Sequence, residues 1–112
     1  MVVESFTGIV LKGKRCGRVL GYPTINIQAM PVPGIYAARV KIDDGEHMAA
    51  AFADPSRGLL EAHLLDYSGD LYGREVTVVL HEKLRDSKRF EDETALRSAI
   101  AQDVVAVRSY FK

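Results

Sequence analysis

The C-terminal end of the chain carries one amphipathic helical pattern, and this pattern limits what the preceding residues can form. Apolar residues recur there at helical spacing: Leu96, Ile100, Val104, Val107 and Phe111. Asp92 can cap the start of this helix, and Glu93 suits its first turn. Because a lone helix buries its apolar face against other elements, we expect it to lie on a sheet formed upstream.

Runs rich in β-branched and aromatic residues, bounded by Gly, Pro and Asp turn signals, predict that sheet. The runs cover residues 4–11, 34–42, 47–53, 59–66 and 74–84. Residues 13–34 are predicted to form one long loop, and loops of this length in compact domains are usually functional. Strands first and a single helix last predict a mainly β fold, an antiparallel Greek-key β-barrel braced by the C-terminal helix.

The run at residues 59–66 has two different faces. Leu60 and Leu64 fall on an apolar face, whereas Glu61 and His63 fall on the other. Glu61 can therefore lie beside a ligand, although a carboxylate on a half-exposed strand is more often simply solvated. We interpret His63 as a packing or supporting residue.

Length and charge restrict the function. The 112 residues suffice for one domain with one core, which we expect to span residues 1–112. Apolar residues make up 47% and charged residues 27%, a balance typical of a folded soluble chain. The formal net charge is zero, which disfavours a nucleic-acid partner. A local basic cluster at residues 12–18 suits a phosphorylated small molecule better.

Cysteine content and hydropathy indicate the compartment. Cys16 is the only cysteine, so an internal disulfide is impossible and a reducing cytoplasm is expected. The N-terminal residues do not resemble a signal peptide, and no apolar stretch approaches the length of a membrane span. We therefore expect a cytoplasmic monomer that does not associate with membranes.

Residues 13–26, GKRCGRVLGYPTIN, combine glycines with cations as phosphate-binding loops do. If the end of this stretch is extended, Thr24 and Asn26 lie on the same side. Their neutral oxygens are hard donors suited to Mg²⁺, which usually takes its other ligands from water and substrate phosphates. The stretch is not a Walker A motif. The alternative is a glycine-rich surface hairpin with solvated cations.

Three aspartates elsewhere in the chain do not form a recognisable metal-binding pattern. Asp66, Asp70 and Asp103 lack any recognisable ligand spacing, and we interpret them as turn and surface residues.

The run GRVLGYPTIN at residues 17–26 resembles the signature of riboflavin kinases (flavokinases), with Ile25 where alanine is usual. Residues 60–67, 70–73 and 84–90 contain LEAHLLDY, DLYG, and LR followed by KRF, which are similar to later motifs of that family in the same order. The match is to the kinase module that in bacteria commonly follows an adenylyltransferase making FAD. The 112 residues leave no room for that second domain, so we expect this chain to make FMN but not to convert it to FAD.

The resemblance implies a small closed barrel of about six strands with one C-terminal helix. It also implies Mg²⁺-dependent transfer of the γ-phosphoryl group of ATP to the ribityl 5′-hydroxyl of riboflavin, giving FMN and ADP. Phosphoryl transfer mostly requires alignment and charge neutralisation, with a carboxylate to accept the hydroxyl proton.

Site residues carried over from the family fall into three groups. The general base is Glu61. The nucleotide-binding residues are Gly13, Arg18, Thr24, Asn26 and Tyr72, of which Thr24 and Asn26 also bind Mg²⁺. The flavin-binding residues are Arg85, Lys88 and Phe90. Without the resemblance, Tyr72 would be an ordinary tyrosine near a turn and Phe90 a core anchor.

The chain departs from the family between its second predicted strand and Glu61. Riboflavin kinases usually carry a longer insertion with Gly-x-x-Pro-Thr there, and residues 54–56, Asp-Pro-Ser, are the nearest remnant. One alternative is therefore a weak or inactive relative that only binds flavin or nucleotide. Another is a barrel that binds single-stranded nucleic acid, which would need stacking aromatics and a salt-sensitive affinity.

Overall fold

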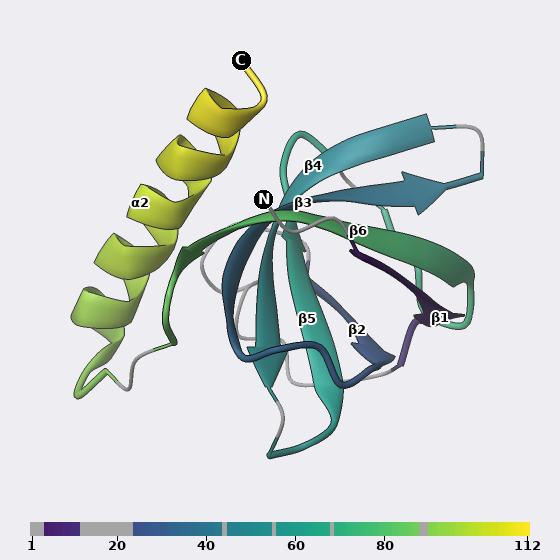
Figure 1. The fold of residues 1–112 in the computed structure, drawn as a ribbon, viewed down its shortest axis with the longest axis horizontal. Helices are drawn as coiled ribbons and strands as arrows, with labels where there is room; N and C mark the ends of the chain where they lie inside the picture. Colours follow the sequence, from purple (N-terminus) through teal and green to yellow (C-terminus); the bar gives the residue numbers. More distant parts are fainter. Residues whose placement is uncertain (1–3, 12–23, 44, 55, 68, 88–89) are drawn as a thin grey trace.

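The structure is a computed structural model that describes residues 4–11, 24–43, 45–54, 56–67, 69–87 and 90–112. Within these ranges, six antiparallel strands form one curled sheet, and one helix stands outside the curl (Figure 1). The elements are β1 (Glu4–Ile9), β2 (Thr24–Gln28), β3 (Gly34–Ile42), β4 (Gly45–Asp54), β5 (Leu59–Leu64), β6 (Glu75–Arg85) and α2 (Glu93–Tyr110).

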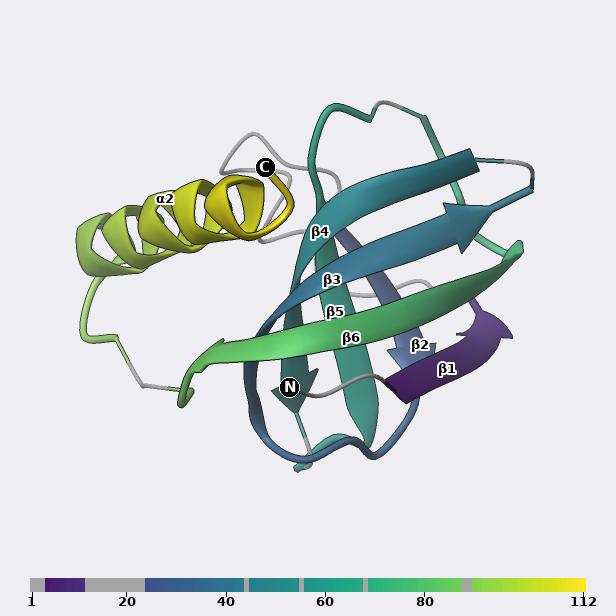
Figure 2. The ribbon, with the colours of Figure 1, turned by 45° about the horizontal axis from the view of Figure 1, so that its top comes forward.

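The strand order across the sheet is β1-β6-β3-β4-β5-β2. The β3–β6 ladder shifts register between Ile35 and Tyr36 and again between Ala37 and Ala38. Such irregularities increase local twist and bend a sheet. The sheet curls into a half-barrel (Figure 2). The chain after β1 meets β2 at a bridge in which the Leu11 N–H donates to the Asn26 carbonyl at 2.7 Å.

A hydrophobic core fills the inside of the curl. Its members alternate along the strands with residues that face outward, as the pleat of a β-strand requires. Those that are fully buried include Ile27, Tyr36, Val40, Leu60 and Leu64.

A smaller core lies between α2 and the outer face of β3 and β4. Ala37 and Ala50 are directly paired across these strands and both are buried. Their small side chains let the helix approach closely, and Ile100, Val104 and Val107 pack there. The helix begins as expected, because the Asp92 carboxylate accepts a hydrogen bond from the Ala95 N–H at 2.8 Å.

The predicted fold class is confirmed, including the antiparallel strands and the C-terminal helix with its apolar stripe. The interpretation of residues 13–34 as one loop was wrong, because Thr24–Gln28 forms strand β2. Isoleucines at positions 25 and 27 enter the core, and pairing with β5 satisfies the backbone of this segment. No helix in the described ranges has both the length and the apolarity needed to cross a membrane.

Candidate active site

Four polar side chains lie next to one another on the outer face of β2 and β5. The register places Thr24 opposite His63 and Asn26 opposite Glu61. Directly opposed residues in an antiparallel pair have Cβ atoms only about 4.5–5.5 Å apart. Two residues expected to bind Mg²⁺ therefore face the expected base and a histidine.

The apolar residues between these positions decide which way the polar groups point. Ile25, Ile27, Leu60 and Ala62 are all buried in the core inside the curl. A slip of one residue would turn the polar side chains into the core and the apolar ones out of it, so the core strongly specifies this register. The expectation that Thr24 and Asn26 share one side, opposite to Ile25, is confirmed.

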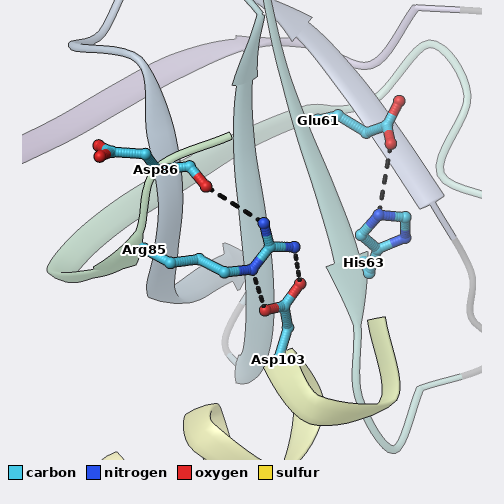
Figure 3. Close-up of polar contacts among 5 residues, drawn as sticks. All are labelled: Glu61, His63, Arg85, Asp86 and Asp103. Carbon is cyan, nitrogen blue, oxygen red and sulfur yellow. Dashed lines mark hydrogen bonds and ion pairs between the residues drawn. The ribbon is translucent and has the colours of Figure 1, made fainter. Parts of the chain in front are cut away.

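His63 contacts both of its polar neighbours through its two ring nitrogens. Its Nδ1 lies 3.1 Å from the Thr24 hydroxyl oxygen. Its Nε2 lies 3.3 Å from Oε1 of Glu61, and Figure 3 shows these two side chains directed at one another. The side chains of His63 and Glu61 are only 10% and 15% exposed. The Glu61 carboxylate is thus held in a largely dehydrated position.

Burial favours the neutral form of the His63 imidazole. Burial disfavours the imidazolium and lowers the pKa of His63 from 6.5 to about 4, although the Asp103 carboxylate acts in the opposite direction. A neutral imidazole has one nitrogen that donates and one that accepts a hydrogen bond. His63 can therefore link one donor and one acceptor.

Asn26 has an orphaned oxygen that fits a magnesium site. The residue is 4% exposed, and its Oδ1 is buried with no hydrogen-bond partner among the described residues. An unpaired buried carbonyl oxygen is unfavourable unless something binds it. No cluster of three or more acidic, His or Cys side chains suited to a metal occurs in the described ranges. The Thr24 and Asn26 oxygens thus fit an ion that shares its coordination with phosphates.

Arg85, expected to bind flavin, forms a two-pronged ion pair with Asp103 of α2. Arg85 Nε and Nη2 donate to the two Asp103 oxygens, both at 2.8 Å, and Nη1 donates to the Asp86 carbonyl at 3.2 Å (Figure 3). The Asp103 carboxylate raises the pKa of Arg85. The contact joins the end of β6 to the helix.

The interpretation of Asp103 as a surface residue was wrong, because it is only 7% exposed. It lies at the helical spacing of Ile100, Val104 and Val107, so it falls on the buried face of α2. That position in the apolar stripe was the available signal. A carboxylate on a buried helical face needs a cationic partner, and Arg85 supplies it.

Phe90 and Tyr72 lie in different surroundings. Phe90 is half-buried, with the Arg85 guanidinium carbon 5.8 Å from the centre of its ring. Tyr72 is 61% exposed, in a turn where its N–H donates to the Asp70 side chain at 2.9 Å. The next residue, Gly73, donates to the Val10 carbonyl at 2.9 Å, which places this turn beside the end of β1.

Gly13, Arg18 and Lys88 lie outside the described residues. The described chain stops at Leu11 and resumes at Thr24. Leu11 is bridged to Asn26. The described residues on either side of this gap, Leu11 and Thr24, therefore both lie at this group of polar side chains.

Comparison with known proteins gives a consistent family assignment. A family model described as Flavokinase, riboflavin kinase, matches residues 3–111. A bifunctional riboflavin kinase/FMN adenylyltransferase of Pseudomonas fluorescens is 42% identical over 91% of this chain and 36% of its own length. The chain spans between 36% and 39% of the length of the curated relatives it matches.

Two solved structures share the fold. One, described as a macrolide-efflux protein from Streptococcus pneumoniae, has a TM-score of 0.81 and 28% identity over 93% of this chain and 38% of that one. The other is riboflavin kinase from Trypanosoma brucei, with a TM-score of 0.67 and 21% identity over 95% of this chain and 78% of that one. With the family model covering nearly all residues, the chain belongs to the flavokinase (riboflavin kinase) family.

Proposed function

We propose that residues 1–112 form a single riboflavin kinase domain that transfers the γ-phosphoryl group of ATP to the ribityl 5′-hydroxyl of riboflavin, giving FMN and ADP. The observation that carries this proposal is the cross-strand group of Thr24, Asn26, Glu61 and His63. In a member of the flavokinase family, this group combines oxygens for a hard cation with a carboxylate that can accept a proton.

Glu61 is the proposed general base. Its carboxylate is largely dehydrated, it is directly opposite Asn26, and His63 contacts it. A base must lie within hydrogen-bond reach of the proton that it accepts, and that hydroxyl must lie in line with the transferred phosphoryl group. The 5′-hydroxyl is therefore proposed to lie between Glu61 and the phosphate held near Asn26.

Thr24 and Asn26 are the proposed protein ligands of Mg²⁺. The orphaned Oδ1 of Asn26 supports this assignment. When bound, Mg²⁺ would neutralise charge on the ATP phosphates. Tyr72, Gly13 and Arg18 are proposed to contact the nucleotide.

Flavin is proposed to bind near the end of β6, through Phe90, Arg85 and Lys88. Phe90 offers an aromatic face, and the ion pair with Asp103 holds the Arg85 side chain beside it. The proposal also includes a location in the cytoplasm, which rests on the lone cysteine, and no nucleic-acid partner, which rests on the zero net charge. We further propose that the chain is a monomer.

The test is to incubate the purified chain with riboflavin, ATP and Mg²⁺ and to follow FMN by chromatography. Glu61→Gln should lower kcat by about 10²–10⁴-fold, the usual contribution of a general base, while calorimetry still detects ATP binding. Thr24→Ala should raise the KM for Mg·ATP. Glu75→Gln, which removes an exposed carboxylate at the start of β6, is the matched control and should behave like wild type.

Each contrary result identifies a different error. Unchanged turnover in Glu61→Gln would show that Glu61 is not the general base. An unchanged KM for Mg·ATP in Thr24→Ala would show that Thr24 is not a magnesium ligand. No FMN from the wild type, with clear binding of riboflavin or Mg·ATP, would identify a binding module.

A further inference from the structure

We propose that His63 is a positioning residue that links the metal-binding side of the site to its base. Its Nδ1 accepts a hydrogen bond from the Thr24 hydroxyl, and its Nε2–H donates one to the Glu61 carboxylate. This inference rests on the function proposed above and adds a role for a residue that contacts neither phosphate nor flavin in that scheme.

The geometry gives His63 one partner for each ring nitrogen. Thr24 Oγ1 lies 3.1 Å from Nδ1, and Glu61 Oε1 lies 3.3 Å from Nε2. The second distance is slightly long for a hydrogen bond, as is common in catalytic sites without bound substrate. His63 lies on the outer face of the sheet, so its ring is directed to polar neighbours rather than to the core inside the curl.

The surrounding strands leave room for the imidazole at this place. On the neighbouring strand β4, the residue opposite His63 is Ala50, which is buried and small. Thr24 is opposite it across β2. The ring therefore lies between a small apolar neighbour and its hydroxyl partner.

Charge decides which nitrogen carries the proton. A general base has to be ionised before it accepts a proton, and an ionised carboxylate only accepts hydrogen bonds. Nε2 must therefore carry the proton that faces Glu61, because a lone pair at that position would be repelled by the carboxylate. The other nitrogen, Nδ1, then has a lone pair and accepts from the Thr24 hydroxyl.

This tautomer orients Thr24 for a cation. Once the hydroxyl proton points at Nδ1, the lone pairs of Oγ1 point in the other directions. A hard cation binds lone pairs and is repelled by a hydroxyl proton. The opposite tautomer would turn the Thr24 proton away from His63 and would present a lone pair to Glu61. One imidazole therefore sets the direction of the hydrogen bonds at both the Thr24 hydroxyl and the Glu61 carboxylate.

Two substitutions can separate the two contacts. In His63→Asn the amide reaches about the place of Nδ1, so it can still accept from Thr24 but no longer reaches Glu61. In His63→Gln the longer side chain reaches about the place of Nε2, so it can still donate to Glu61 but no longer meets Thr24. His81→Gln is the matched control, since His81 lies on β6 and contacts the rings of Tyr110 and Phe111.

Steady-state kinetics with varied Mg·ATP is the first measurement. We expect His63→Asn to lower kcat by about tenfold with a nearly unchanged KM for Mg·ATP, the effect of one lost hydrogen bond to a charged group. We expect His63→Gln to raise that KM by about tenfold and to keep more of kcat. His81→Gln should change neither. Equal effects of both His63 variants on kcat and KM would overturn the proposal, because a purely structural residue would act in that way.

The second measurement does not need turnover. Imidazole ¹⁵N chemical shifts of the ligand-free protein should show His63 protonated at Nε2 and accepting at Nδ1, and Thr24→Val should shift the Nδ1 signal. A ring protonated at Nδ1 would overturn the positioning role even if FMN is made. Absence of FMN from the wild type would instead overturn the proposed function, and with it the catalytic importance of His63.

Discussion

Mild acid should destabilise this protein through His63. Burial lowers the pKa of His63 from 6.5 to about 4 in the folded state, whereas the unfolded chain binds a proton near the ordinary value. Between these two values the unfolded chain holds more protons, so the free energy of unfolding rises with pH. The contribution of His63 to stability is therefore complete above pH 6.5 and is lost as the pH falls towards 4.

The size of the effect follows from the shift. Loss of the whole contribution corresponds to roughly 3 kcal/mol, and about 2 kcal/mol of it is already lost at about pH 5. A domain of this size is stabilised by only about 5–15 kcal/mol in total, so the change is large enough to measure.

The assay is urea unfolding at several pH values in this window, for the wild type and for His63→Gln. The variant has no titrating group at this position, so its stability should fall less steeply towards acid. Titrating groups that do not contact His63, such as His81, whose pKa burial also lowers, remain in both proteins, and their effects cancel in the difference.

Direct titration of the His63 ring by NMR provides a check that does not depend on the stability of the variant. The imidazole signals should stay at their neutral positions down to about pH 5. Equal pH slopes for the two proteins, or a ring that titrates near 6.5, would refute the reasoning from burial.

Two further substitutions test the packing around the site. Asp103→Asn removes the charge that holds Arg85, whose side chain is 31% exposed. The substitution should lower the free energy of unfolding by about 1–3 kcal/mol. Thermal unfolding followed by circular dichroism should then show a Tm lower by roughly 4–12 °C. An unchanged Tm would mean that the ion pair adds nothing. Leu60→Ala leaves a cavity beside Glu61 at a fully buried position and should lower the free energy of unfolding by about 2–5 kcal/mol in urea titrations. A loss below 1 kcal/mol, roughly the smallest change expected for a deleted methylene, would show that the core collapses around it.

Local patterns were sufficient for much of the fold. The strand at residues 34–42 was predicted with the bounds that the structure has, and the helix after Asp92 begins at its expected cap. These elements depend on short-range chemistry, namely β-branched runs, turn residues and a side chain that satisfies free N–H groups. The strand at residues 24–28 was missed because it is short and follows a glycine-rich stretch, so that its pairing with β5 outweighs its local signal.

The sequence by itself determined the faces of the site strands. Alternation places Thr24 and Asn26 on one side of their strand and Glu61 and His63 on one side of theirs, because the side-chain period of a strand is two. The same regularity of the helix places Asp103 among its apolar residues.

Only the tertiary structure decided which of these groups meet. The register of β2 against β5 puts Thr24 beside His63 and Asn26 beside Glu61, although these pairs are far apart in the sequence. The docking of α2 brings Asp103 to Arg85. Both outcomes depend on how the whole chain buries its apolar residues, since register and docking are set by the shared core and not by any local pattern.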